Sequence, residues 1–257
     1  MPDAQQPAQP DELVHYAVAD QVATITLDSP HNRNALSARL VAELGDRLER
    51  AEADPAAKVV LLRAEGSVFC SGADLSEASA AGSEDAPRGI VRLQRLVVGS
   101  TKPVVLRLQG AVRAGGIGLV AAADVVVAVE DATFALTEVK LGLAPAVISL
   151  TVLPRLTSRA AAYTFLTGET FTGAEAERMG LVTRAVPADA LDAEVERVCA
   201  SLATGAVQGL RESKALLAED LLERIDRLGD DVAARSARLF GSEEAREAMT
   251  AFLSRKK

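Results

Sequence analysis

Cysteine is scarce in this 257-residue chain, which has only Cys70 and Cys199 and no CxxC spacing. Two cysteines are too few for a disulfide framework, so we expect a reduced, cytoplasmic protein. Tryptophan is absent and aromatic residues make up 3% of the chain, which disfavours a stacking platform for nucleic-acid bases. Positive charge is also in deficit, because 28 Lys and Arg against 36 Asp and Glu leave a net charge of −8. Without a basic surface to meet phosphates, we do not expect nucleic acid as a partner.

Long apolar runs are missing as well. The longest extend over about ten residues, too few to cross a bilayer, so we expect no membrane segment. Residues 1–12 lack the basic start and apolar stretch of a signal peptide, and we expect them to form a flexible lead-in.

The motifs of several enzyme classes are also absent. The chain has two histidines, His15 and His31, and no Gly-x-Ser-x-Gly elbow, so a Ser-His-Asp hydrolase is not expected. It has no HExxH motif, no cysteine pair, no calcium loop and no Walker-type phosphate loop. We therefore expect chemistry that uses no metal, thiol or serine nucleophile.

The patterns that are present predict an α/β domain over residues 13–200. Residues 14–19 and 22–27 alternate apolar and polar side chains around Asp20-Gln21, which predicts a β-hairpin. Ser37 is expected to cap a helix that ends near Asp54-Pro55. Helical segments separate most of the later apolar runs, a pattern typical of parallel strands. These runs are Val59–Leu62, Pro103–Leu108, Asp124–Val129 and Leu181–Val186.

Residues 201–257 form a predicted C-terminal helical region. A long helix is expected to carry one apolar stripe, and Ser242 is expected to cap a last helix with inward-facing residues. The stripe either packs on the core or meets a neighbouring subunit. Its members are Leu210, Leu217, Leu221, Ile225 and Leu228, and the inward residues of the last helix are Ala245, Met249, Phe252 and Leu253.

Two glycine-bearing loops each follow a predicted strand, at residues 68–75 and 110–118. Glycines allow tight turns and close backbone approach, and a helix N-terminus offers unpaired amides. If the loops face each other, they can form an oxyanion hole from the backbone alone. The alternative is that both are ordinary turns between a strand and a helix.

The second loop also matches another fingerprint. Residues 116–121 fit the G-x-G-x-x-G/A pattern of NAD-dependent oxidoreductases. The helix has little room, however, and the acidic Glu130 follows Gly116 by about 14 residues where about 20 are usual. This oxidoreductase alternative is therefore weakly supported.

Four segments together resemble the enoyl-CoA hydratase/isomerase (crotonase) family, from about Val14 to Phe252. The resemblance implies a crotonase-like spiral of ββα units, a C-terminal helical trimerisation region, and trimers that often pair into hexamers. It also implies an acyl-CoA thioester as substrate, with coenzyme A as part of the substrate and no separate cofactor. The segments are residues 31–37 (HNRNALS), 69–75 (FCSGADL), 110–118 (GAVRAGGIG) and 134–143 (FALTEVKLGL).

The resemblance also assigns catalytic residues. Ala73 and Gly115 correspond to the two backbone amides that hold the thioester oxygen, where they stabilise an enolate. Glu138 corresponds to a catalytic acid/base, and partial burial is expected to raise its pKa towards neutrality. Hydratases of the family usually carry a second glutamate three residues beyond Gly115, and this chain has Gly118 there.

The loss of that carboxylate leaves the reaction open. Hydration of a 2-enoyl-CoA is slightly favoured by the resemblance, but it then needs a water held by another group. Δ3-Δ2-enoyl-CoA isomerisation needs only one base. A catalytically inactive acyl-CoA-binding relative is a third possibility.

The binding residues follow from the same resemblance. Ala73, Asp74 and Arg33 are expected to contact coenzyme A, together with Phe252 and Arg255 near the C-terminus. Arg113 and Gly118 are expected to line the acyl pocket.

Overall fold

The computed structural model describes residues 12–74, 77 and 84–254, with only the backbone at 252–253. Its larger sheet has six strands in the order β1-β2-β3-β5-β7-β10. β1 and β2 form the predicted antiparallel hairpin, and every later pairing in this sheet is parallel, as predicted. The strands are β1 (Val14–Ala19), β2 (Val22–Leu27), β3 (Val59–Ala64), β5 (Val104–Leu108), β7 (Val125–Val129) and β10 (Arg184–Val186).

A second, smaller sheet has the order β4-β6-β8-β9. Its strands are short. β4, β6 and β8 each follow a long strand of the larger sheet along the chain, so that three successive units contribute one strand to each sheet before a helix or 3₁₀ helix begins. This repetition confirms the expected spiral of ββα units. The strands are β4 (Val68–Cys70), β6 (Ala111–Arg113), β8 (Thr133–Ala135) and β9 (Phe171–Thr172).

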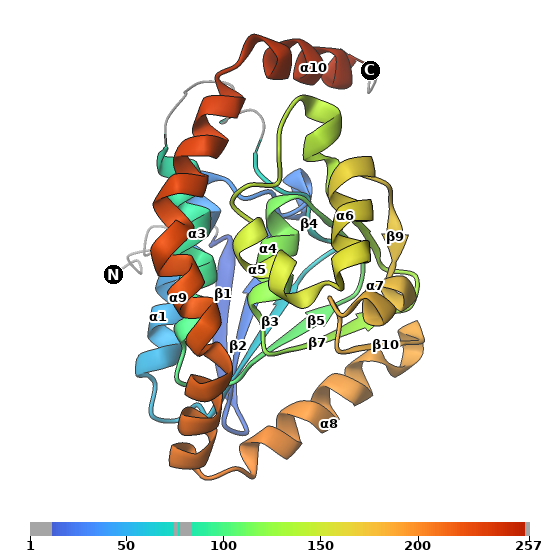
Figure 1. Ribbon diagram of the computed structural model, residues 1–257. Coiled ribbons are helices and arrows are strands. Elements are labelled where there is room, and N and C mark those ends of the chain that lie inside the picture. The colour runs from blue at the N-terminus through green and yellow to red at the C-terminus, as the bar shows by residue number, and fades with distance from the viewer. Residues whose placement is uncertain (1–11, 75–76, 78–83, 255–257) are drawn as a thin grey trace, which may run out of the picture.

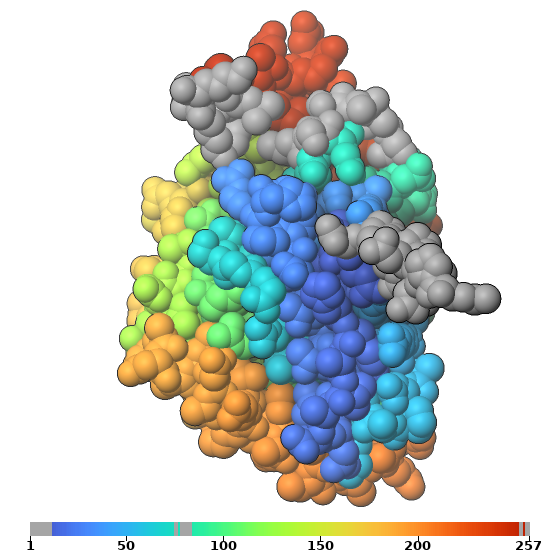
Figure 2. Space-filling model, turned by 180° about the vertical axis from the view of Figure 1, so that it is seen from behind, coloured from blue at the N-terminus to red at the C-terminus, as the bar shows by residue number. Residues whose placement is uncertain are grey.

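Helices surround the two sheets (Figure 1). The α1 helix begins at the predicted cap, where the Ser37 side chain accepts a hydrogen bond from the Leu40 amide. The helices of the core are α1 (Ala38–Ala53), α3 (Asp85–Gly99), α4 (Gly115–Ala122), α5 (Ser149–Arg155), α6 (Ser158–Thr167) and α7 (Gly173–Met179), with 3₁₀ helices η1 (Pro30–Asn32) and η2 (Thr137–Leu141). On the opposite face, the N-terminal strands form a blue band down the middle of the surface (Figure 2).

The described part of residues 201–257 is helical, as predicted, and the C-terminal helical part already begins at residue 188. This part contains η3 (Ala188–Ala190), α8 (Leu191–Ala203), α9 (Val207–Phe240) and α10 (Glu243–Ser254). The α8 helix packs on β3, β5 and β7, whereas α9 lies along α3 and α5 of the same chain (Figure 1). The predicted cap of α10 is present, because Ser242 Oγ accepts a hydrogen bond from the Ala245 amide at 3.2 Å.

One member of the expected α9 stripe does not pack on the core of this chain. Leu221 and Ile225 are buried as predicted, but Leu217 is 80% exposed. The buried face of α9 is centred on a different line, which includes Lys214 and Ala218. Leu217 lies beyond the edge of that face, because the contact with α3 and α5 is narrower than the apolar stripe.

A buried ion pair fastens α9 to the core. Lys214 Nζ donates hydrogen bonds to Asp124 Oδ2 at 2.7 Å and to the carbonyl oxygens of Val97 and Lys102 at 3.1 and 3.0 Å. The Lys214 side chain is 4% exposed, and burial lowers its pKa. The Asp124 carboxylate also accepts a hydrogen bond from the Val104 amide, so the pair is embedded in backbone contacts.

Among the described residues, no helix is both long and apolar enough to cross a membrane.

Candidate active site

The two glycine-bearing loops meet at Gly72 and Ala114. Gly72 has a φ of +93°, and a Cβ built on it would lie 2.9 Å from Ala114 Cβ and 3.2 Å from the Arg113 carbonyl oxygen. A larger residue would collide with the facing loop and would also be strained at this φ. Glycine at position 72 therefore allows the two backbones to touch.

The amides of Ala73 and Gly115 lie on either side of this contact. Ala73 pairs with Leu36 in a parallel bridge, where the Leu36 amide donates to the Gly72 carbonyl at 2.8 Å. Parallel pairing uses the neighbours of Ala73 and leaves its own amide facing away. Gly115 is the first residue of α4, so its amide has no partner within the helix. Among the described residues neither amide donates a hydrogen bond, and a Cβ at Gly115 would lie 3.8 Å from Ala73 N.

Ala114, immediately before α4, has a φ of +45° and a ψ of −121°. This conformation is costly for a residue with a Cβ, by about 1–3 kcal/mol. Hydrogen bonds on both sides hold it, since its amide donates to the Ala135 carbonyl and its carbonyl accepts from the Ile117 amide. The strained residue turns the chain sharply at the point where the Gly115 amide begins the helix.

Asn34 anchors the segment that precedes α1. Its buried side chain accepts a hydrogen bond from the Ser29 amide at 2.7 Å and donates to the carbonyl oxygens of Glu65 and Val68 at 3.0 and 2.8 Å. Three chain segments are thereby joined next to Ser71 and Gly72. Asn34 belongs to the HNRNALS segment, but the sequence alone indicated no role for it.

Glu138 lies in η2, directly after the buried residues of β8. Its Oε2 atom is buried and has no hydrogen-bond partner. Burial raises the pKa of the carboxyl group from 4.5 to about 7, against a smaller opposing effect of its own backbone amide. The neighbouring Lys140 is exposed, and no ion pair joins it to Glu138 within the described residues. The environment therefore suits a general acid/base near neutral pH.

Two connected cavities meet beside Glu138. The inner cavity has a volume of about 90 Å³ and an almost wholly apolar lining. The outer cleft has a volume of about 620 Å³ and is more polar. Both are lined by Ala73, Ala114, Glu138 and Phe240. The two free amides and the carboxyl group thus lie at the junction between an apolar chamber and an open cleft.

Comparison with known proteins decides the family. The model of the enoyl-CoA hydratase/isomerase family matches residues 18–257. The chain belongs to this family. A crystal structure of an enoyl-CoA hydratase from Mycobacterium avium is 47% identical, with a TM-score of 0.89 over 96% of this chain and 98% of that one. A crotonyl-CoA hydratase of Syntrophomonas wolfei is 28% identical over 93% of this chain and 94% of its own length.

The reaction named for relatives is not uniform. A hydroxycinnamoyl-CoA hydratase-lyase of Pseudomonas fluorescens is 33% identical over 68% of this chain and 67% of its own length. Because the chain belongs to the enoyl-CoA hydratase/isomerase family and has the crotonase fold, residues 116–121 are not the dinucleotide-binding motif of an oxidoreductase. The family name alone does not specify the reaction.

The residues predicted to contact coenzyme A fall into two groups. Arg33, Ala73 and Asp74 line the outer cleft. Arg255 lies outside the described residues, and so does the side chain of Phe252. The outer cleft is therefore where this family member gathers the described residues expected to contact coenzyme A.

The two residues predicted to line the acyl pocket do not line the inner cavity. Arg113 lines the outer cleft, and its guanidinium donates to the carbonyl oxygens of Val112 and Thr133. It is turned outwards because these backbone groups of β6 and β8 bind it. Gly118 does not line the inner cavity, because the side chain of Ile148 fills the space before it: a Cβ at Gly118 would lie 2.7 Å from Ile148 Cγ2 and 3.1 Å from Ile148 Cβ.

Other lining residues were not predicted. Ile148, Ser236 and Phe240 line the inner cavity. In the sequence, Ile148 and Phe240 are ordinary apolar positions, and Ser236 is an isolated serine in a predicted helix. Apart from Glu138, Ser236 carries the only hydroxyl or charged side chain of the described lining. Periodicity marks such positions as core, and only the packing of α5 and α9 shows that a cavity lies beside them.

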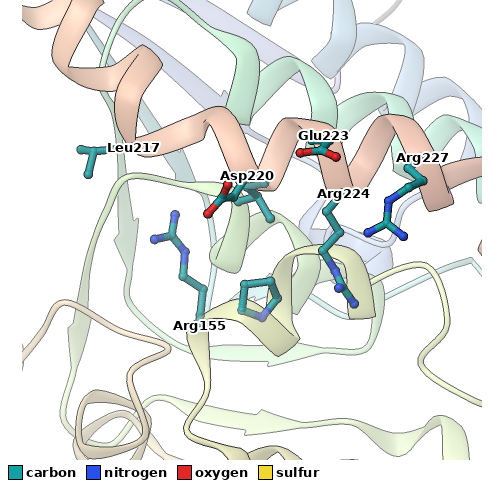
Figure 3. A pocket seen from close by; sticks show the side chains of 8 residues that line it. Arg155, Leu217, Asp220, Glu223, Arg224 and Arg227 are labelled. Carbon is teal, nitrogen blue, oxygen red and sulfur yellow. The ribbon is translucent and has the colours of Figure 1, made fainter.

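A separate hollow of about 480 Å³ lies between α5 and α9. Arg155 extends from α5 towards α9, and Arg224 extends from α9 towards α5 (Figure 3). The lining also includes Leu217 and Asp220 and shares no residue with the two cavities at Glu138. It is therefore distinct from the candidate active site.

Proposed function

We propose that the protein isomerises a 3-enoyl-CoA to the 2-enoyl-CoA through a thioester enolate, with Glu138 as the single acid/base. The observation that carries this proposal is a carboxyl group whose buried Oε2 atom has no hydrogen-bond partner, beside an otherwise nearly apolar chamber. Ile148 occupies the space before Gly118, where a second carboxylate would have to stand. A site with one base suits a reaction that moves one proton and consumes no water.

The proposed steps balance without any other reactant. The Glu138 carboxylate removes a proton from carbon 2, and the electron pair of that bond delocalises onto the thioester oxygen. The amides of Ala73 and Gly115 stabilise the resulting dienolate, an effect for which one such donor is typically worth about 3–4 kcal/mol. Glu138 then returns the proton to carbon 4, so that the double bond lies between carbons 2 and 3. A pKa of about 7 allows the same group to act as base and then as acid.

Hydration of a 2-enoyl-CoA is the second candidate. The names of the relatives favour it, and one structural feature supports it. Ser236 offers a hydroxyl group in the same chamber as Glu138, which provides a second polar group for holding a water molecule. Serine cannot replace a carboxylate as a base, so Glu138 would have to serve both proton transfers.

The test is a panel of short thioesters with separate detection of isomerised and hydrated products. Incubation with 3-butenoyl-CoA should yield 2-butenoyl-CoA, and E138Q should remove this activity. Glu196→Gln is a matched control, since Glu196 is exposed on α8, and it should retain full activity. Conversion of 2-butenoyl-CoA to the 3-hydroxy product without isomerisation would favour hydration. Binding of every thioester without any turnover would indicate an inactive relative.

We also propose that the chain assembles as a trimer or as a hexamer formed by two trimers. The adjacent Leu216 and Leu217 of α9 are 77% and 80% exposed, and Leu217 borders the hollow between α5 and α9. Neighbouring apolar side chains exposed on one helix favour a covered surface in an assembly. Sedimentation should give a trimer or hexamer for the wild type and a smaller species for L216E/L217E. A monomeric wild type would refute this assembly.

A further inference from the structure

The inner cavity is small for an acyl chamber. Its volume is about 90 Å³, whereas an apolar cavity of about 150 Å³ is the size that admits a benzene ring. An acyl group that places its carbonyl at the two amides therefore has space for only a few carbons beyond it.

Ile148 forms the wall that limits this space. Its side chain lies against α4 at Gly118, three residues beyond Gly115, which is about 4.5 Å further along the helix axis. The Ile148 side chain therefore contacts α4 nearly one helical turn beyond the Gly115 amide. Ile148 is 2% exposed, so other parts of the protein pack around it except where it faces the inner cavity.

A buried polar cluster fixes the position of this wall. Gln94 of α3 is fully buried and donates to the Val147 carbonyl at 3.3 Å. The Thr151 hydroxyl lies 2.8 Å from Gln94 Oε1 and 3.0 Å from the Gly118 carbonyl oxygen. These hydrogen bonds connect α3, α4 and α5 next to Ile148. Displacing Ile148 would disturb them, and Gln94 is fully buried, so the loss of its hydrogen bonds would be costly.

We propose that Ile148 is the residue that determines acyl-chain length, and that it restricts the enzyme to short, unbranched acyl groups of about four carbons. This rests on the proposed function to the extent that an acyl thioester must enter the inner cavity. Shortening the Ile148 side chain opens the chamber towards Gly118 and Gln94. The affinity for longer chains then rises, while the amides and Glu138 keep their positions.

The experiment measures equilibrium binding of saturated butyryl-, hexanoyl- and octanoyl-CoA, with free coenzyme A as the baseline. Wild-type protein should bind butyryl-CoA at least 10-fold more tightly than octanoyl-CoA, and I148A should reduce this ratio about 10-fold. I225A is the matched control, because Ile225 is a buried isoleucine of α9 that lines neither cavity. It should keep the wild-type ratio. If I148A does not fold, I148V should shift the ratio in the same direction by a smaller factor.

Two results would overturn the proposal: octanoyl-CoA binding to the wild type as tightly as butyryl-CoA, or an unchanged ratio in a folded Ile148 variant. Because the experiment measures binding and not turnover, it tests the role of Ile148 independently of the proposed isomerase reaction. The expected binding profile without turnover of any enoyl thioester would support the role of Ile148 and refute the isomerase. If no acyl-CoA binds more tightly than free coenzyme A, both proposals fail.

Discussion

Replacing Glu138 by glutamine should change how the stability of the protein depends on pH. Burial raises the pKa of this carboxyl group from 4.5 to about 7 in the folded protein, and unfolding returns it to its ordinary value. Between these values the unfolded chain has lost the proton that the folded chain still holds, so raising the pH favours unfolding. The contribution of Glu138 to stability is therefore complete below pH 4.5 and is lost as the pH rises through about 7.

The magnitude follows from the two pKa values. They differ by 7 − 4.5 = 2.5, and one pKa unit corresponds to about 1.4 kcal/mol. The free energy of unfolding of E138Q should therefore rise relative to that of the wild type by about 3 kcal/mol between pH 4.5 and pH 8. A constant difference between the two proteins, such as the cost of burying the amide, does not affect this comparison.

Urea titrations followed by circular dichroism measure this difference at each pH, at one fixed protein concentration. E196Q should follow the wild type at every pH, because Glu196 is exposed. Parallel pH curves for E138Q and the wild type would refute the reasoning. They would show that the Glu138 carboxyl group is hydrated, and the argument for a base tuned by burial would fail with it.

Three further predictions concern the framework of the site and are measured by urea unfolding. K214M should lower the free energy of unfolding by about 3 kcal/mol, because it leaves the buried Asp124 carboxylate without its cation; a loss below about 1 kcal/mol would contradict this. A114G should raise it by about 1 kcal/mol, because glycine relieves most of the strain of the positive φ but adds entropy to the unfolded chain; a lower stability would show that Ala114 is not strained. G118A should lower it by about 1–3 kcal/mol through overlap with Ile148, and this cost should shrink in an I148A background; an equal cost in both backgrounds would place the conflict elsewhere.

The parts of the fold with strong local signals were predictable. The hairpin has the predicted bounds because alternation and a two-residue turn specify it locally. Ser37 begins α1 because a hydroxyl before an amphipathic run satisfies a free amide. Parallel strands such as β7 consist almost entirely of buried Val and Ala, and a short apolar run between turns indicates them.

The smaller sheet was not predictable in this way. Its strands β4, β6 and β8 have three residues each and β9 has two, too few for alternation to be recognised. β4 and β6 lie within residues 68–75 and 110–118, which were expected to be glycine-bearing loops. The pairing of β4 with β6 brings the two loops together, and this contact between distant segments has no local signal.

The same contrast between local motifs and contacts of distant segments applies to the candidate site. The loops and Glu138 were found through motifs, and the structure places them at one junction. Ile148 and Gln94 were missed, since a core isoleucine and a core glutamine have no spacing that reveals a wall. Leu217 stays exposed because periodicity defines an apolar stripe, whereas the helices packed against it decide how much of the stripe they cover. A buried Lys214 at the centre of that face contradicts the usual exposure of lysine.

The contribution of α9 to the chamber gives one helix two tasks. It is continuous from Val207 to Phe240, is attached to the core through Lys214, and places Ser236, Ala237 and Phe240 in the lining of the inner cavity. A change that loosens the attachment at Lys214 therefore also alters one side of the chamber, although Lys214 itself lines neither cavity.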